Sequence, residues 1–257
     1  MNTSEKLIAL KAIITKEILR FSRIWIQTVL PPVITTALYF IIFGNLIGPR
    51  IGEMDGFGYM EFIIPGLIMM AVITNSYANV VSSFYGSKFQ RHIEEMLISP
   101  VPNYIILIGY ISGGVARGLT VGVAVTVVSL VFHPLNIHSL WVMFSMIILT
   151  AILFSLAGLI NGVYAKSFDD ISIIPTFVLT PLTYLGGIFY SISMLPEFWQ
   201  QLSLANPILY MVNAFRYGFL GISDISLLTS YAISIGFIIA LYIYSLYLLR
   251  KGHGIRT

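Results

Sequence analysis

Six predominantly apolar stretches, each long enough to cross a lipid bilayer as a helix, take up most of the sequence. An α-helix needs about 20 apolar residues to cross the hydrocarbon core. Charged residues make up only 10% of this chain, against about 25% in soluble domains. A separate soluble domain of about 100 residues has no room beside these stretches. We therefore predict an all-α membrane protein that forms a single domain over residues 1–257, with spans at residues 24–43, 59–85, 104–132, 140–164, 171–190 and 226–249.

The fifth stretch, residues 171–190, contains several residues that interrupt helices. Pro175 and Pro181 each remove a backbone donor and crowd the preceding turn, and Gly186-Gly187 weakens the far end. Such interruptions persist at membrane depth only where neighbouring helices, side chains or water satisfy the freed backbone groups. We therefore expect this stretch to face protein or a cavity rather than lipid.

Residues 195–221 are too short to cross the membrane twice and too apolar for an ordinary loop. Pro196 followed by Glu197 is typical of a first helical turn. Asn206-Pro207 supplies a capping side chain and then a proline at the first helical position. We predict short re-entrant helices that enter the outer leaflet and return. Four aromatic residues in this part of the chain favour a belt at the membrane interface: Tyr184, Tyr190, Trp199 and Tyr210.

The distribution of positive charge predicts the orientation of the chain. Cytoplasmic loops of membrane proteins are enriched in Lys and Arg. Eleven of the fourteen Lys and Arg lie on one side of a six-span chain, in the N-terminal segment, the second-to-third loop, the fourth-to-fifth loop and the C-terminal tail. Arg50 and Arg216 are on the other side, and Arg117 is within the third span. Both termini are therefore predicted to be cytoplasmic.

Residues 2–23 lack the early apolar core and the small-residue cleavage site of a signal peptide. Their apolar residues recur at three- and four-residue steps, as in a helix that lies in the membrane interface with its basic residues against lipid phosphates. A plain cytoplasmic tail is the alternative. The apolar stripe is Leu7, Leu10, Ile14, Ile18, Phe21 and Trp25, and the basic residues are Lys6, Lys11, Lys16, Arg20 and Arg23.

Residues 88–102 form the one substantial charged loop between spans. Drawn as a helix, the segment places its apolar residues on one face and its charged residues on others, and Pro100 and Pro102 end it. Taken alone, such a segment is a short amphipathic loop with a solvated charged face. The apolar residues are Phe89, Ile93, Met96 and Leu97, and the charged ones are Arg91, Glu94 and Glu95.

Small residues follow the helical repeat in the second and third spans. The third span contains two rows, Gly109-Gly113 and Gly114-Gly118-Gly122, so we expect other helices to pack very close to it. In the second span, Asn75 and Asn79 adjoin a row of small residues, which favours helix packing over a substrate site. Arg117 lies between the two glycine rows. A charge within a span is a functional candidate, and we expect Arg117 to bind carbonyl groups or to line a wet cavity.

The motifs of several enzyme classes are absent. There is no G-x-x-x-x-G-K-[ST] loop for nucleotide phosphates, no H-E-x-x-H and no G-x-S-x-G. The chain has no Cys, its four His give no metal-ligand spacing, and a net charge of +3 is too small to indicate nucleic acid. Asp169 and Asp170 fit the start of a helix better than an acid–base pair. The sequence therefore predicts neither an enzyme nor a metal protein.

The glycines, prolines and neighbouring residues of the fifth stretch and of the segment after it resemble a known signature. Leu185-Gly186-Gly187, Leu195-Pro196, Pro207-Ile208-Leu209-Tyr210 and Arg216 occur with the order and spacing of the ABC type-2 transporter permease family. The resemblance extends more loosely over nearly the whole chain. It is strongest to small bacterial inner-membrane permeases of the drug and Nod-factor export kind.

The resemblance implies a multi-pass exporter permease of the bacterial inner membrane that pairs with a second copy of itself and with two ATPase subunits, which would carry the ATP and Mg. It also implies that residues 88–102 are the coupling helix seated in the ATPase. A stand-alone secondary carrier or channel is the alternative. The candidate coupling residues are Phe89, Arg91, Glu94, Glu95 and Met96. The pathway or gate candidates are Arg117, Pro175, Pro181, Tyr184, Gly186, Gly187, Pro196, Pro207, Tyr210 and Arg216.

Overall fold

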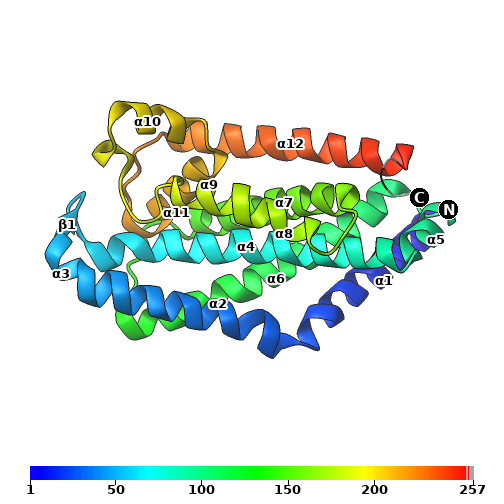
Figure 1. Cartoon of the computed structure of the whole chain (residues 1–257), viewed down its shortest axis with the longest axis horizontal. Coiled ribbons are helices and arrows are strands. Elements are labelled where there is room, and N and C mark those ends of the chain that lie inside the picture. The colour runs from blue at the N-terminus through cyan, green and yellow to red at the C-terminus, as the bar shows by residue number, and fades with distance from the viewer. Residues whose placement is uncertain (253, 255–257) are drawn as a thin grey trace.

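The computed structural model describes residues 1–252 and 254, most of which are helical (Figure 1). The first half of the chain forms α1 (Thr3–Ser22), α2 (Trp25–Tyr39), the π-helical stretch η1 (Phe40–Ile47), α3 (Gly48–Ile51), a hairpin of β1 (Glu53–Met54) and β2 (Phe57–Gly58), α4 (Tyr59–Phe89), α5 (His92–Ile98) and α6 (Asn103–Phe132). The second half forms α7 (Leu140–Tyr164), α8 (Asp170–Ile174), the π-helical η2 (Pro175–Leu179), α9 (Thr180–Tyr184), the 3-10 helix η3 (Ile192–Met194), α10 (Glu197–Leu204), α11 (Pro207–Leu220) and α12 (Leu227–Lys251).

Within residues 1–252 and 254, five helices are long and apolar enough to cross a membrane, in agreement with the prediction of an all-α membrane protein. They are Trp25–Ile51, which joins α2, η1 and α3, together with α4, α6, α7 and α12. Helix α4 runs through the middle of the molecule and is its most buried span. The start of α1 and the last turn of α12 lie at the same end as α5, which we call the α5 end (Figure 1). The β hairpin, α3 and α10 lie at the opposite end.

The two glycine rows of α6 bring other helices into close contact, as predicted. A Cβ atom on Gly113 would lie 2.5 Å from the Cβ of Glu17, so the first row packs against α1. A Cβ on Gly118 would collide with Ser76, so the second row packs against α4. Glycine contacts on both sides of α6 leave little freedom for α4 or α6 to slide.

The fifth predicted span is shorter than expected. Helical structure runs without a break through α8, η2 and α9, fifteen residues from Asp170 to Tyr184, and then turns at Gly187, whose φ is +72°. The residues 185–190 of the predicted span are therefore turns rather than helix. The π-helical η2 begins at Pro175, because a wider turn accommodates a residue that cannot donate to the usual carbonyl.

Helix α1 differs from the interfacial helix drawn from its sequence. The face turned towards the protein carries Ile13, Glu17 and Phe21, and it packs on α6. Two of the basic residues predicted to meet lipid phosphates, Lys16 and Arg20, instead contact α6 and α4. The periodicity correctly indicated a helix. Of the stripe predicted to lie against the membrane, Leu7, Ile18 and Trp25 are exposed in the single chain, whereas Phe21 is buried against the protein.

Candidate functional site

Residues 88–102 do not form one helix. Helix α4 continues to Phe89, the chain turns through Arg91 in the left-handed conformation (φ +63°), and α5 covers only His92–Ile98. Phe89 therefore does not share a helical face with Ile93, which is buried. The predicted apolar face of residues 88–102 was wrong in this respect, because periodicity gives no sign of a left-handed residue within a charged segment.

Two residues directly before the turn that leads to α5 contact the C-terminal end of α7 and the segment that follows it. The Lys88 Nζ donates to the carbonyl oxygens of Val163 and Ala165, each at 2.7 Å. The ring of Phe89 lies 5.2 Å from that of Phe168, in the segment that follows α7. Phe89 is still 65% exposed, so it remains available to a partner while it packs within the chain.

The charged side chains of α5 occupy different surroundings. Arg91 and Glu95 are exposed, whereas Glu94 and Met96 are half-buried. Ile98 is 83% exposed, which makes it the most exposed large apolar residue of the described chain. Sequence reasoning missed Ile98, although an isoleucine directly before Ser99-Pro100 at the end of an amphipathic helix was visible there.

A buried carboxylate joins α1 to α4. Glu17 is fully buried, and its Oε1 lies 3.0 Å from the Lys16 Nζ and accepts a hydrogen bond of 2.7 Å from Ser83. The Arg20 Nε lies 3.5 Å from Oε2 of the same carboxylate. The Arg20 Nη2 also donates to both the backbone carbonyl and the side-chain oxygen of Asn79. The sequence analysis did not predict this cluster. The signal for it was Glu17 itself, an acidic residue one helical turn from both Ile13 and Phe21.

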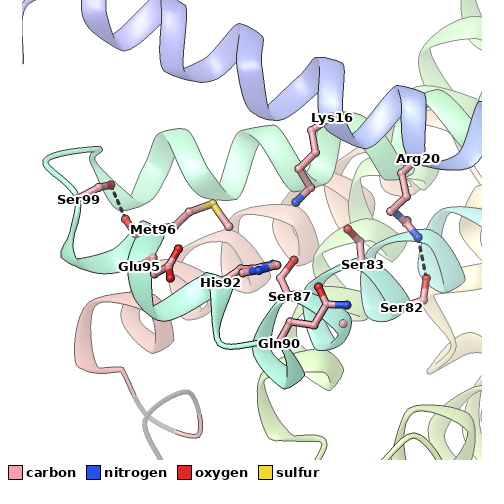
Figure 2. A pocket seen from close by; sticks show the side chains of 11 residues that line it. Lys16, Arg20, Ser82, Ser83, Ser87, Gln90, His92, Glu95, Met96 and Ser99 are labelled. Carbon is pink, nitrogen blue, oxygen red and sulfur yellow. Dashed lines mark hydrogen bonds between the residues drawn. The ribbon is translucent and has the colours of Figure 1, made fainter.

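Helices α1, α4 and α5 line a polar cavity of about 540 Å³ that is open to the outside at the α5 end (Figure 2). Figure 2 shows Lys16 and Arg20 reaching into it from α1, with His92, Glu95 and Met96 on α5. Serine side chains of α4 line the remaining wall. The ion pairs of α1 and the residues of α5 therefore border the same cavity.

One of the two carboxylates after α7, that of Asp170, stabilises the start of α8, as predicted. The Asp170 Oδ2 accepts hydrogen bonds from the backbone N–H groups of Lys166 and Ser167, and the Ser167 Oγ accepts one from the N–H of Asp170. The reciprocal bonds between Ser167 and Asp170 follow the pattern of a capping box. The hydrogen bonds from Lys166 and Ser167 hold the pKa of Asp170, at the start of α8, below its usual range.

Arg117 lies near the middle of α6 and lines a second cavity, of about 360 Å³. Its Nη2 donates to the Oδ1 of Asn75 on α4 at 3.0 Å. Residues of α2 form the opposite wall. Arg117 therefore borders a cavity, and its hydrogen-bond acceptor is a side-chain amide rather than a backbone carbonyl.

Side chains donate hydrogen bonds to carbonyl groups of the broken fifth segment. The Asn161 Nδ2 donates to the carbonyl of Ile171, four residues before Pro175, and the Asn206 Nδ2 donates to that of Leu182. One face of this segment is nevertheless uncovered in the single chain, where Phe177 is 73% exposed and Pro181 and Tyr184 are also exposed. The Tyr184 hydroxyl lies 3.4 Å from that of Tyr39 on α2, so the fifth segment and the first span meet here.

The predicted helix starts at Pro196 and Pro207 are confirmed. Pro196 directly precedes α10, and Pro207 is the first residue of α11, with the Asn206 Oδ1 accepting the N–H of Ile208 at 3.0 Å. Tyr210 is only 9% exposed and its hydroxyl donates to the carbonyl of Leu204, so it is not part of an exposed interfacial belt. A Cβ on Gly186 would lie 2.7 Å from Ile208, which explains a small residue there.

Arg216 is fully buried and holds three elements together. Its guanidinium carbon lies 3.9 Å from the centre of the Phe62 ring on α4, and its Nη2 donates to the carbonyl of Gly187 at 2.5 Å. With Asp55 and Asp224 it lines a small cavity of about 210 Å³. The distribution of positive charge predicts an outer position for Arg216 but did not predict that the side chain is buried.

The sequence profile of the ABC-2 type transporter family matches residues 8–220, most of the chain. The chain belongs to this family. The match confirms the resemblance first seen in the residues from Leu185 to Arg216. Of these signature residues, Gly187 and Arg216 are joined by a hydrogen bond, and Pro207 begins the helix that carries Arg216.

Two groups of relatives are similar to it. The "Inner membrane transport permease YadH" of Escherichia coli (strain K12) is 63% identical over 251 residues, which cover 97% of this chain and 98% of that protein. "Nodulation protein J" of Sinorhizobium fredii (strain NBRC 101917 / NGR234) is 25% identical over 182 residues, 70% of this chain and 69% of that protein. The chain is therefore a multi-pass inner-membrane protein of a family of transport permeases.

Proposed function

We propose that this chain is the transmembrane subunit of an ATP-driven exporter, which moves an amphiphilic substrate such as a drug, a lipid or a glycoconjugate out across the inner membrane. The sequence contains no nucleotide-binding loop, so the ATP and Mg would be bound by a separate ATPase subunit. Family membership supports this division of labour. The chain itself is then a permease rather than an enzyme.

The single observation that carries this proposal is the position of α5. It is a short helix between two spans, at one end of the molecule, and it presents Arg91, Glu95 and Ile98 to the outside. The clustering of Lys and Arg at that end supports a cytoplasmic location. We propose that α5 seats in the ATPase, with Phe89, Arg91, Glu94, Glu95, Met96 and Ile98 at or near the contact.

The proposed transport cycle follows from the contacts of α5. Closure of the ATPases would push α5 towards the membrane, and α5 shares a polar cavity with Lys16 and Arg20 of α1. The movement would reach α4 through the Glu17–Ser83 and Arg20–Asn79 hydrogen bonds. Because α4 is the central helix, its displacement would reshape the pathway.

We propose that two copies of the chain associate along α2 and the segment from α8 to α9. Both present uncovered apolar side chains, including Ile34 and Phe177, and they adjoin each other at Tyr39 and Tyr184. In this arrangement the segment from α8 to α9 completes a sixth crossing of the membrane together with the turns that follow. The re-entrant helices α10 and α11 would cap the pathway on the outer side.

The experiment is to extract the tagged chain in mild detergent and to assay the co-purifying material for ATPase activity. We expect a bound ATPase in the wild type and its loss in Glu94→Lys/Glu95→Lys, because the two carboxylates would contact basic residues of the partner. Since Glu95 also lines the polar cavity, Arg91→Glu provides a second charge reversal outside it. Arg50→Glu, an exposed arginine at the opposite end, is the matched control.

Either of two results would count against the proposal. One is a wild-type chain that purifies without any nucleotide-dependent activity. The other is ATPase binding that survives both charge reversals on α5. Transport that persists in vesicles without nucleotide would favour a stand-alone carrier or channel instead.

A further inference from the structure

The cavity around Arg117 combines one cation with amphipathic walls. Gln27, Thr35 and Thr74 are exposed at its rim, and Pro31, Met70 and Ala78 contribute apolar surface. Of the residues that line it, all within the described part of the chain, Arg117 is the only charged one. A volume of about 360 Å³ lies within the range of small-ligand sites.

The hydrogen-bonding capacity of Arg117 is largely unused. A guanidinium carries five N–H donors and cannot lose its charge in a protein. Within residues 1–252 and 254, Arg117 makes one side-chain hydrogen bond, to Asn75, and its buried Nε has no partner. A cation at mid-span needs an anionic or strongly polar partner, since the low dielectric there makes an unpaired charge costly.

No acidic side chain of the described residues forms an ion pair with Arg117. The two ion pairs in this part of the chain both involve Glu17, which is shared by Lys16 and Arg20. Glu61, near the start of α4, accepts a hydrogen bond from Asn136. The described part of the chain therefore supplies a fixed cation beside a cavity without supplying its counter-ion, and an anionic group from outside the chain would complete the site.

Two asparagines of α4 lie between this cavity and the polar cavity of Figure 2. Arg20 lines that first cavity and donates to Asn79, while Arg117 donates to Asn75. Asn75 and Asn79 are one helical turn apart on the same face of α4. The cations of the two cavities are therefore hydrogen-bonded to neighbouring amides of one helix.

From this arrangement we infer that the Arg117 cavity binds the acidic headgroup, phosphate or carboxylate, of an amphiphile whose hydrocarbon chain lies against α2 and α4. The inference rests on the proposed export function and deepens it, because it makes the preferred substrate an anionic amphiphile. Bidentate hydrogen bonding by arginine favours both headgroups. The Thr35, Thr74 and Asn75 side chains would provide the polar contacts beside the charge.

Native mass spectrometry of the purified chain in neutral detergent tests the inference. The probes are didodecanoyl phosphatidic acid and, as the neutral probe with the same chains, didodecanoyl glycerol. We expect the wild type to bind the acid about tenfold or more tightly than the neutral lipid, a factor in keeping with one charge-assisted contact. Arg117→Gln should abolish the preference, and Arg117→Lys should retain part of it. Arg50→Gln, an exposed arginine at the opposite end, should leave it unchanged.

A second variant protects the test against misfolding of the arginine variants. Thr74→Phe fills the cavity from an exposed rim position and leaves Arg117 in place, so it should also remove binding of the acid. Wild-type protein without a preference for the acid would overturn the inference. So would an undiminished preference in Thr74→Phe or in folded Arg117→Gln.

Competition identifies the source of the headgroup. Displacement of phosphatidic acid by dodecyl phosphate would support a single-chain amphiphile as the ligand, and failure to displace it would support a bilayer phospholipid bound by the same chemistry. The measurement needs no ATPase partner. The two proposals are therefore tested independently. Absence of an ATPase partner would not affect the lipid-binding result, and absence of lipid binding would not affect the result for the ATPase partner.

Discussion

Three charged side chains show how individual residues organise this protein. Glu17, Arg117 and Arg216 are each at least partly buried, and each contacts another helix through a side chain or a backbone atom. Glu17 is neutralised by two cations, Arg216 contacts an aromatic face and two carbonyls, and Arg117 contacts an amide alone. The least satisfied of the three is the one beside a cavity in the middle of a span.

The Glu17 cluster makes a prediction at this scale. Glu17→Ala would leave Lys16, Arg20 and Ser83 without their shared acceptor, and breaking a buried pair in this way costs about 3 kcal/mol. We expect a clear fall in the thermal unfolding midpoint of the detergent-solubilised chain. Lys11→Ala, at an exposed position of the same helix, should have little effect. Equal midpoints for Glu17→Ala and the wild type would show that the cluster carries no stability.

Among the elements, close helix contacts depend on a few glycines. A Cβ on Gly158 of α7 would lie 2.5 Å from the backbone oxygen of Tyr77 on α4. Backbone atoms cannot move aside as a flexible side chain can, so α4 and α7 would have to separate. A Cβ on Gly236 of α12 would meet no atom within 4 Å. The two glycines therefore form a matched pair.

Alanine at each of these glycines should have opposite effects. Gly158→Ala should lower stability by about 1–3 kcal/mol through overpacking, whereas Gly236→Ala should be neutral or slightly stabilising. Thermal unfolding of the two variants in the same detergent provides the comparison. If Gly158→Ala were as stable as Gly236→Ala, the close approach of α4 and α7 would be incorrect.

Much of the element structure could be predicted because it depends on local chemistry. The glycine rows of α6, the Asn206-Pro207 helix start and the cap at Asp170 were all confirmed from short patterns. The face of α1 that packs against the protein could not be derived from the sequence. More than one apolar stripe can be drawn along this helix, and only its contacts with α4 and α6 decide which face is buried. The turn at Arg91 and the burial of Arg216 depend on contacts with residues far away in the chain.

At the scale of the whole molecule, several helices leave apolar side chains exposed. The outward faces of α2 and of the segment from α8 to α9 are among them, and Phe177 is 73% exposed. In a lipid environment such a face can meet lipid or protein. The polar backbone interruptions at Pro175 and Pro181 favour protein, because lipid offers no hydrogen-bond partners.

Cross-linking tests the assignment of this face to a second copy. The natural chain has no cysteine, so a single Phe177→Cys substitution introduces the only thiol. We expect a short bifunctional maleimide to link Phe177→Cys into dimers in native membranes. Val131→Cys, on α6 and 82% exposed, should react with the reagent but should remain monomeric. If Val131→Cys formed dimers equally well, the cross-linking would not be specific to the face around Phe177, and the assignment of that face to a second copy would be contradicted.

The composition of the intact complex tests the central claim most directly. Native mass spectrometry of the complex extracted from its own membrane should show two copies of this 28.6 kDa chain with two copies of a second subunit that binds ATP. That result would establish an ATP-driven permease built from separate membrane and ATPase subunits. A species containing only this chain, obtained under conditions gentle enough to keep its dimer, would contradict the account.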